Sequence, residues 1–205
     1  MTIRIKLSGG LGNQMFQFAT GFAIAKKKNV RLSLDLKYIN RRKLFNGFEL
    51  DKVFNIYAKV NFLDKSLSTT SFNIRNLLDK ININSNKFEE PHFHYTSKIL
   101  DVPKNCFLDG YWQSELYFKD YTKELKEIFT FINQSDEKNK LIISDINQNN
   151  SISIHIRRGD FLFKQNNNHN TDLKDYYLKA INESSKIYKI IHVFGIKSSI
   201  QIDLS

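Results

Sequence analysis

Gly9-Gly10-Leu11-Gly12-Asn13-Gln14 is the stretch that decides the fold, because it separates a strand pattern from a helix pattern. Before it, Ile3, Ile5 and Leu7 alternate with basic residues, which is the period-two pattern of a β-strand. After it, apolar residues recur at helical spacing up to Ala25, and three lysines follow where the helix dipole favours cations. From residue 30 to residue 34, apolar and polar side chains alternate again, as in a second β-strand. Strand, helix and strand in this order predict a βαβ unit with a parallel sheet.

The pattern further along the chain predicts a second α/β region behind a polar break. Expected helices lie at 73–83, 114–131, 137–146 and 173–186, and expected strands lie at 106–108, 151–157 and 189–194. The run Gln148-Asn149-Asn150 marks the predicted boundary between a domain of residues 1–148 and the beginning of a second domain at residues 149–205. The predicted fold class is α/β, with a Rossmann-like N-terminal domain and an incomplete second Rossmann-like domain.

Composition limits the classes of partner. The chain has 205 residues, of which 41% are hydrophobic and 13% aromatic, enough to bury a core. The formal net charge of +10 favours anions such as sugar nucleotides, anionic lipid surfaces or nucleic acid. A general enrichment in Lys and Asn is the alternative explanation of that charge. The basic residues are spread along the chain rather than clustered, which argues against a nucleic-acid partner.

The cysteine content and the hydropathy of the chain predict the cellular compartment in which the protein works. The single cysteine, Cys106, excludes an internal disulfide framework and is expected to be a core thiol in a reducing compartment. No signal peptide is expected, because charges and the glycine turn interrupt the first apolar residues. The longest apolar stretch, around Phe16 to Ala25, is far shorter than the ~20 residues that span a bilayer. We expect a cytoplasmic protein, with peripheral contact at the inner face of the membrane left open.

The glycine motif has the chemistry of an anion site. Glycines adopt backbone angles forbidden to other residues and let the main chain approach a ligand closely. The helix expected to begin near Asn13 would present unpaired N–H groups and the positive end of its dipole. A tight strand-to-helix turn without a ligand is the alternative. The missing Gly-x-x-x-x-Gly-Lys-Ser pattern argues against a P-loop nucleotidase.

The second motif, His155-Ile156-Arg157-Arg158-Gly159-Asp160, begins within the strand predicted at 151–157 and continues into the turn after it. Alternate side chains share a face, so His155 and Arg157 are expected to point together at the carboxyl end of that strand. Open α/β sheets bind ligands at those ends. A guanidinium group matches phosphate oxygens, and beside a leaving diphosphate it would stabilise the charge that grows as the bond to the sugar breaks.

Structural roles are the alternatives for the same residues. Asp160 is expected to hold Arg158 or the turn by a charge-assisted hydrogen bond. The alternative for the two arginines is a salt-bridged strand end. The alternative for His155 is a polar residue whose hydrogen bonds are all made within the protein. The two motifs together predict a site for the diphosphate of a nucleotide.

The residues of both motifs resemble those of a known family. Gly9-Gly10-Leu11-Gly12-Asn13-Gln14-Met15-Phe16-Gln17, followed by the second motif, resembles the bacterial α-1,2-fucosyltransferases of glycosyltransferase family 11. Gly110-Tyr111-Trp112-Gln113-Ser114 with Tyr117-Phe118, and Asp175-Tyr176-Tyr177 with Ala180-Ile181, are also similar to residues of that family. The resemblance runs from the N-terminus to about Ile181.

The resemblance implies a glycosyltransferase that moves L-fucose from GDP-fucose to the 2-hydroxyl of a galactoside. It implies inversion, no obligatory metal or other cofactor, and two Rossmann-like domains facing across a cleft, the GT-B arrangement. The N-terminal domain would lie on the acceptor side, and the second domain would bind the donor nucleotide. Surface polysaccharide such as O-antigen is the implied product.

The implied site residues fall into three groups. The catalytic residues would be Arg157, on the donor β-phosphate, and His155, on the nucleotide. The donor-binding residues would be Gly10, Gly12, Asn13, Arg157, Arg158 and Asp160, with Gly12 and Asn13 near the phosphates and fucose. On the acceptor side, Tyr111 and Trp112 would stack on a sugar, with core packing as the alternative. For the general base, His169, Asp172 and Glu115 are candidates, with surface or capping roles as the alternative.

After the predicted boundary near Asn150 only 55 residues remain (205 − 150), giving two strands and one helix, whereas the family continues for several more strand–helix units. A serine- and tryptophan-rich segment that helps hold the guanine nucleotide belongs to that part. A second domain this small buries little surface. We therefore expect a frameshifted or prematurely stopped product with negligible transferase activity. The alternative function is a non-catalytic remnant that binds an anionic ligand or a partner.

Overall fold

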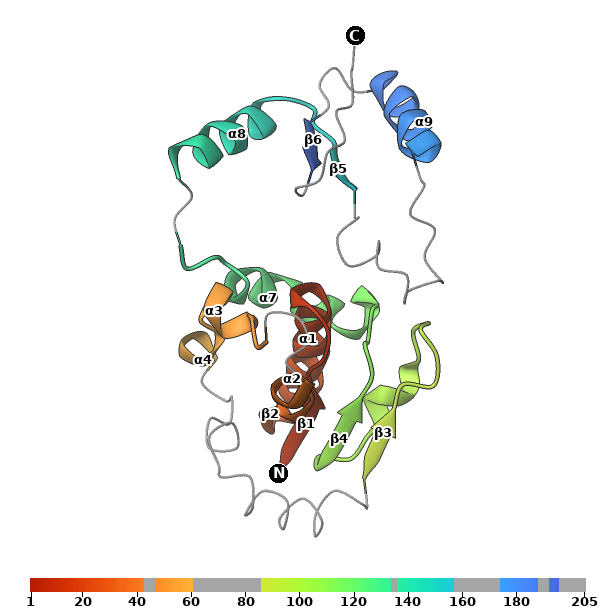
Figure 1. Ribbon diagram of the computed structural model, residues 1–205. Helices are drawn as coiled ribbons and strands as arrows, with labels where there is room; N and C mark the ends of the chain where they lie inside the picture. The colour runs from red at the N-terminus through yellow and green to blue at the C-terminus, as the bar shows by residue number, and fades with distance from the viewer. Residues whose placement is uncertain (43–46, 61–85, 134–135, 157–173, 188–191, 196–205) are drawn as a thin grey trace. The chain divides into compact units, whose positions relative to one another are not determined.

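The computed structural model describes residues 1–42, 47–60, 86–133, 136–156, 174–187 and 192–195 (Figure 1). The chain forms two compact units, Met1–Gln134 and Ser135–Ser205. Helix α8 (Glu137–Gln148) groups with the second unit, so the compact units divide on the other side of this helix from the boundary expected between residues 148 and 149. The assignment of domains to these ranges stays a prediction.

The first unit is built on a four-stranded parallel sheet. Its strands are β1 (Thr2–Lys6), β2 (Arg31–Asp35), β3 (Lys87–Glu89) and β4 (Cys106–Asp109). Their order across the sheet is β2-β1-β4-β3, and all three pairings are parallel. Helix α1 (Leu11–Lys28) connects β1 to β2, which confirms the predicted βαβ unit, and begins two residues before the expected start near Asn13. This mixed α/β fold is consistent with the predicted Rossmann-like domain.

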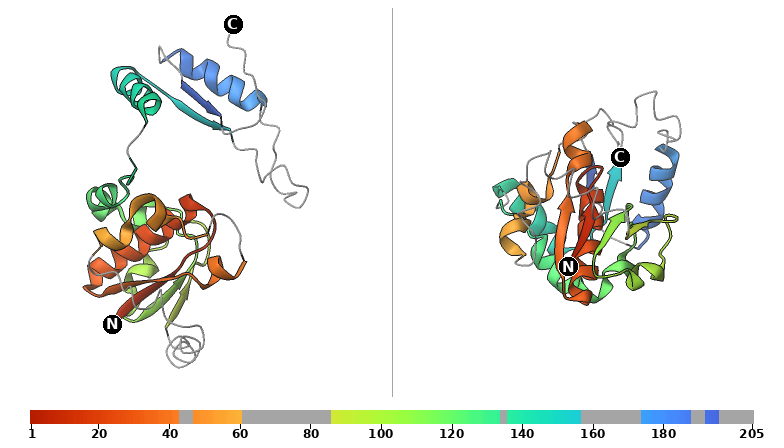
Figure 2. Two further views of the ribbon diagram at one scale, coloured as in Figure 1. Left: turned by 60° about the vertical axis from the view of Figure 1, so that its left-hand side comes forward. Right: turned by 90° about the horizontal axis from the view of Figure 1, so that it is seen from below.

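The core lies between α1 and the sheet. Alternation along β1 buries Ile3 and Ile5 completely and leaves the basic residues between them part-exposed, as the sequence predicts. Figure 2 shows α1 lying along the strands of this unit. The contact is close at Gly21, where a Cβ atom would lie 2.9 Å from side-chain atoms of both Ile5 and Leu32. Cys106 is buried in β4, and burial raises the pKa of its thiol, as expected for a core thiol.

Short helices complete the first unit. They are α2 (Lys37–Arg42), α3 (Leu50–Phe54), α4 (Ile56–Lys59), α7 (Thr122–Ile128) and the 3₁₀ turns η1 (Ser97–Asp101), η2 (Glu115–Tyr117) and η3 (Lys119–Tyr121). The continuous helix predicted at 114–131 is therefore wrong. The backbone leaves helical geometry at Phe118, because Tyr117 turns into the core against Trp112 while Tyr121 packs edge-on against Phe22. Tertiary packing of aromatic rings overrides the local helical spacing.

The second unit repeats the strand–helix–strand theme. Strands β5 (Ser153–Ile156) and β6 (His192–Gly195) pair in parallel, and α9 (Lys174–Ser185) lies between them in sequence (Figure 2). The predicted strands at 151–157 and 189–194 and the helix at 173–186 are confirmed over the described residues. The helix predicted at 73–83 lies outside them. None of the described helices is long and apolar enough to cross a membrane.

Candidate functional site

The glycine turn lies at the centre of the first sheet. It follows β1, and a second turn, Gly110–Gln113, follows the neighbouring strand β4. Because the two strands are parallel, their carboxyl ends lie at the same edge of the sheet. The order β2-β1-β4-β3 places β1 and β4 side by side at the centre of the sheet, so the two turns lie next to each other at its carboxyl edge. Open α/β sheets bind ligands outside the carboxyl ends of their strands.

Only one glycine of the motif, Gly9, is required by its backbone conformation and by the atoms around it. Gly9 has a φ of 76°, and a Cβ atom there would lie 2.3 Å from Asn13 Nδ2. In contrast, a Cβ on Gly10 or Gly12 would meet no atom within 4 Å. Gly10 is the N-cap of α1 and has no side chain with which to cap it, and the first turn holds no acidic residue. The first amide N–H groups of α1, which have no acceptor within the helix, are therefore bordered by open space.

Two buried glutamines hold the glycine turn in place. Gln14 Nε2 donates to the carbonyl oxygens of Gly9 (3.0 Å) and Gly47 (2.9 Å), and its Oε1 accepts from the Glu49 amide at 3.0 Å. These bonds join the turn to the segment before α3. Gln14 belongs to the glycine motif, but the motif alone did not predict this role.

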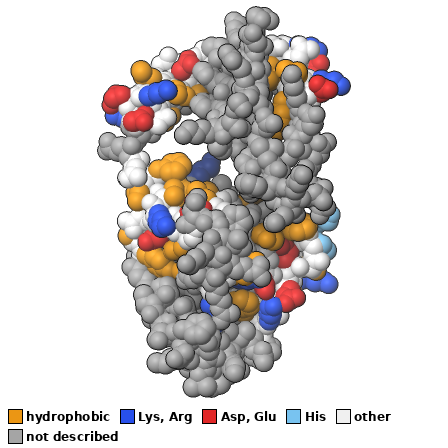
Figure 3. All heavy atoms as spheres, viewed as in Figure 1, with side chains coloured by type: hydrophobic (Ala, Val, Ile, Leu, Met, Phe, Trp, Pro, Cys, Tyr) orange, Lys and Arg blue, Asp and Glu red, His pale blue; other side chains and the backbone are white. Residues whose placement is uncertain are grey.

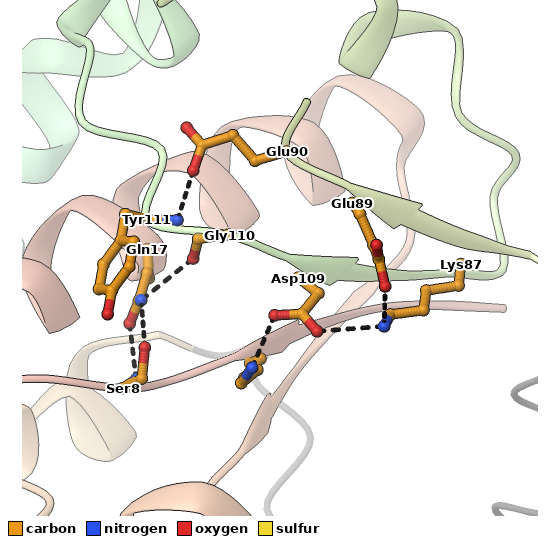
Figure 4. A network of polar contacts seen from close by, with 9 residues as sticks. Ser8, Gln17, Lys87, Glu89, Glu90, Asp109, Gly110 and Tyr111 are labelled. Carbon is orange, nitrogen blue, oxygen red and sulfur yellow. Dashed lines mark hydrogen bonds and ion pairs between the residues drawn. The ribbon is translucent and has the colours of Figure 1, made fainter. Parts of the chain in front are cut away.

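The second glutamine, Gln17, ties the two turns together (Figure 4). Its Oε1 accepts from the Ser8 amide at 2.9 Å, and its Nε2 donates to Ser8 Oγ (2.9 Å) and to the Gly110 carbonyl (3.1 Å). Polar residues at positions 14 and 17, inside an apolar helix, were the signal that could have identified both. Buried amides with every group bonded rigidify the backbone around them.

The β4 turn is held from the edge strand. The Glu90 carboxylate accepts from the Tyr111 amide (2.7 Å) and the Trp112 amide (3.0 Å), as Figure 4 shows for Tyr111. A Cβ on Gly110 would lie 2.4 Å from the Glu90 Cβ, so glycine is needed for this approach. From this turn Gln113 Nε2 donates to Asn13 Oδ1 at 2.7 Å. The turns after β1 and β4 are thus joined by side chains as well as by strand pairing.

Two lysines near this edge of the sheet, Lys6 at the carboxyl end of β1 and Lys87 at the start of β3, form ion pairs. Asp109 Oδ1 lies 2.8 Å from Lys6 Nζ, and Asp109 Oδ2 lies 3.2 Å from Lys87 Nζ, which also pairs with Glu89 (Figure 4). Burial alone would raise the pKa of Asp109, but the hydrogen bonds and charges of the two lysines outweigh it and hold this pKa below its usual value. In this part of the site, backbone amides rather than these ammonium groups are left to meet an anionic ligand.

The aromatic residues of the β4 turn behave differently from one another. Trp112 is 0% exposed, stacks with Phe88 and meets Tyr117 edge-on. Its ring offers no face to a sugar, so the core-packing alternative applies to Trp112, and the predicted stacking does not. Tyr111 is 39% exposed, and its ring lies 6.3 Å from that of Phe93, which is 70% exposed and was not singled out from the sequence.

The second motif is described only in part. His155 is the third residue of β5 and pairs in register with Phe194, and Ile156, paired with Gly195, ends the strand. The motif therefore begins at the carboxyl end of a parallel strand, as the sequence predicts. Outside the described residues lie Arg157, Arg158, Asp160, His169 and Asp172. Their roles stay predictions.

The remaining predictions for the site concern the general base and metals. Glu115 begins η2 and is exposed, which fits the alternative of a surface residue in a first turn. Within the ranges that the structure describes, no three His, Cys, Asp or Glu side chains gather where they would hold a metal ion. The expectation of a metal-independent reaction stays a prediction.

Comparisons with known proteins bear on the whole chain. Residues 1–197 match the family described as "Glycosyl transferase family 11". The "Alpha-1,2-colitosyltransferase" of Escherichia coli is 39% identical over 162 residues, which cover 77% of this chain and 54% of that protein. The "O-antigen biosynthesis glycosyltransferase WbnK" of Escherichia coli is 30% identical over 203 residues, covering 85% of this chain and 65% of that protein. The chain thus spans less than two thirds of the length of these relatives. No solved structure matches it.

Proposed function

The chain belongs to glycosyl transferase family 11, and we propose that its site serves the transfer of L-fucose from GDP-fucose to the 2-hydroxyl of a galactoside, with inversion. One observation carries the proposal. The glycine turn lies at the carboxyl edge of the central strands, is held by Gln14 and Gln17, and leaves open space beside the N-terminus of α1.

The donor end of the reaction needs groups that stabilise a leaving diphosphate. The free amides and dipole of α1 supply positive potential that is fixed before the reaction begins. We assign Gly10, Gly12 and Asn13 to the donor on this ground. In the second motif, Arg157 would contact the β-phosphate and His155 the nucleotide, with Arg158 and Asp160 supporting them. These groups would meet the developing charge without a metal ion.

The acceptor end needs a surface that suits a sugar, which has apolar C–H faces and polar edges. Tyr111 of the β4 turn and Phe93 form an exposed aromatic pair. Tyr111 stands two residues before Gln113, whose side chain bonds to Asn13 of the glycine motif. Rings with exposed faces would pack against the C–H groups of a galactoside. We propose that Phe93 and Tyr111 form the acceptor platform.

Colitose is a second candidate for the transferred sugar. The relative that is 39% identical is named for colitosyl transfer with α-1,2 linkage. Colitose is fucose without its 3-hydroxyl, so the two donors share the diphosphate, the apolar methyl group and the reacting carbon. The second relative's name favours an O-antigen glycan as acceptor.

The test is a transfer assay on the purified full chain with radiolabelled GDP-fucose, the corresponding colitose nucleotide and β-galactoside acceptors. Because the family match covers residues 1–197, we expect a labelled product with an α-1,2 linkage and one GDP released per sugar transferred, in place of the negligible activity that the sequence alone predicted. Binding of GDP without product from either donor would favour the non-catalytic remnant over this proposal.

The same assay tests the acceptor platform with two matched variants. Phe93→Ala is expected to raise the acceptor KM by about tenfold and to leave the donor KM unchanged, because it removes a stacking face. Phe131→Ala is the control, since Phe131 is 69% exposed and Phe93 is 70% exposed. Equal effects of the two variants on the acceptor KM would argue against the platform.

A further inference from the structure

The contact between Asn13 and Gln113 fixes the direction of an amide at the glycine turn. Gln113 Nε2 donates to Asn13 Oδ1 at 2.7 Å, so the carbonyl side of the Asn13 amide faces Gln113. The NH₂ side lies over Gly9, where a Cβ would be 2.3 Å from Nδ2. The terminal torsion of Asn is soft and close to two-fold, so this amide has no strong orientation of its own. Turned round, it would present a carbonyl oxygen, which repels a diphosphate.

The backbone that carries Gln113 is strained. Trp112, directly before it, has a φ of 57°, a left-handed conformation that is an outlier for a bulky side chain. Such a conformation is energetically unfavourable and persists only where the surrounding structure holds it in place. Strained residues of this kind cluster at functional sites.

Three separate features hold Trp112 in that conformation. Its ring is completely buried, its amide and that of Tyr111 both donate to Glu90, and Gly110 lets Glu90 approach. Because Glu90 follows β3 and Trp112 follows β4, the edge strand braces a turn next to the central strands. The result of this bracing is the placement of Gln113 against Asn13.

We propose that Gln113 is a positioning residue that holds the Asn13 amide with its NH₂ group toward the diphosphate or sugar of the donor. The proposal rests on the proposed function, because it takes Asn13 as a donor-binding residue. Gln113 itself is not assigned a contact with substrate. Its effect on the reaction is expected to pass entirely through Asn13.

A double-mutant cycle on the full chain tests this dependence. Gln113→Ala is expected to lower kcat/KM for GDP-fucose by about tenfold, Asn13→Ala by at least as much, and the double variant by no more than Asn13→Ala alone. Residues in one network show such coupling, whereas independent structural roles add. Additive losses would overturn the proposal.

Two further variants separate positioning from general damage. Gln113→Glu cannot donate to Asn13 Oδ1 and would accept from Nδ2 instead, so it is expected to turn the amide and to lose more activity than Gln113→Ala. The matched control is Asn105→Ala, an exposed amide just before β4 at its opposite end, which is expected to keep wild-type kinetics. Wild-type activity in Gln113→Glu would contradict the proposal.

A binding measurement keeps this inference distinct from the proposed function. The side-chain NH₂ resonance of Asn13 is expected to shift in Gln113→Ala, and the affinity for GDP is expected to fall by about tenfold. If the wild-type chain binds GDP with this coupling but transfers no sugar, the proposed function fails and the positioning role stands. If transfer occurs and the side-chain resonance of Asn13 is the same in the wild type and in Gln113→Ala, the positioning role fails. A wild-type chain that does not bind GDP would overturn both.

Discussion

At the scale of single residues, the glycine motif contains two kinds of glycine. Gly9 is required by a backbone φ of 76° and by the nearness of Asn13, whereas Gly12 lies in the first turn of α1 with open space beside it. The sequence shows the glycines but not this difference, because the neighbour of each Cβ position is set by the fold. The difference makes opposite predictions for the two residues.

Gly9→Ala and Gly12→Ala are expected to change stability in opposite directions. Alanine at Gly9 is strained and displaces Asn13, so it should lower the free energy of unfolding by about 1–3 kcal/mol. Alanine at Gly12 suits a helix and should raise the free energy of unfolding by up to about 1 kcal/mol.

If the donor occupies the space beside Gly12, Gly12→Ala should nevertheless weaken GDP binding. Urea denaturation and calorimetric titration measure both quantities. If Gly12→Ala binds GDP as tightly as the wild type, the donor does not occupy the space beside Gly12.

The roles of Gln14, Gln17 and Trp112 depend on partners that are distant in sequence. The two glutamines bond to Gly47 and Gly110, and Trp112 packs between Phe88 and Tyr117. Residue type alone left Trp112 open between a sugar-binding and a core role, and only its zero exposure decides for the core. Exposure also singles out Phe93, whose surroundings in the sequence carry no motif.

At the scale of elements, hydrophobic periodicity predicted the helices and strands whose formation depends on their own sequence. The first strand, helix and strand follow from periodicity, and so do α8, β5, α9 and β6 over the described residues. Strand β3 has only three residues, so its place in the sheet comes from pairing with β4 and not from its own sequence. The segment 114–131 failed as one helix because its aromatic side chains are drawn to the core in different directions.

Asp109 at the end of β4 pairs with Lys6 at the end of β1 and with Lys87 at the start of β3, which predicts a pH dependence of stability. The pKa of Asp109 lies below its usual value, so the folded chain binds this proton less readily than the unfolded chain. The resulting stabilisation is present above about pH 4 and is lost as the pH falls through the lowered pKa. Because these pairs are part-exposed, with Asp109 at 23%, we expect only about 0.5–1 kcal/mol at neutral pH.

Asp109→Asn tests this element by urea denaturation at pH 7, 5 and 3. The difference in unfolding free energy between wild type and variant should be present at pH 7 and 5 and should shrink at pH 3. Glu124→Gln is the control, since the Lys26–Glu124 pair is more exposed, at 37% and 46%, and joins no strands. A difference for Asp109→Asn that is the same at all three pH values would contradict the account.

At the scale of the molecule, the family is confirmed over residues 1–197, and each compact unit contributes one of the two motifs. The glycine motif belongs to the first unit, and His155 belongs to the second. Charges of both signs are interspersed among the described side chains on the face seen in Figure 3, so the net charge of +10 does not form a single basic stripe there.

The measurement that tests the central claim most directly is a titration of the isotopically labelled full chain with GDP, followed by backbone amide resonances. The account predicts the largest shifts at the amides of Leu11, Gly12 and Asn13, with smaller shifts in the β4 turn, and half-saturation that moves to higher GDP concentration as salt is added. Binding of GDP that leaves these three amides unshifted would contradict it.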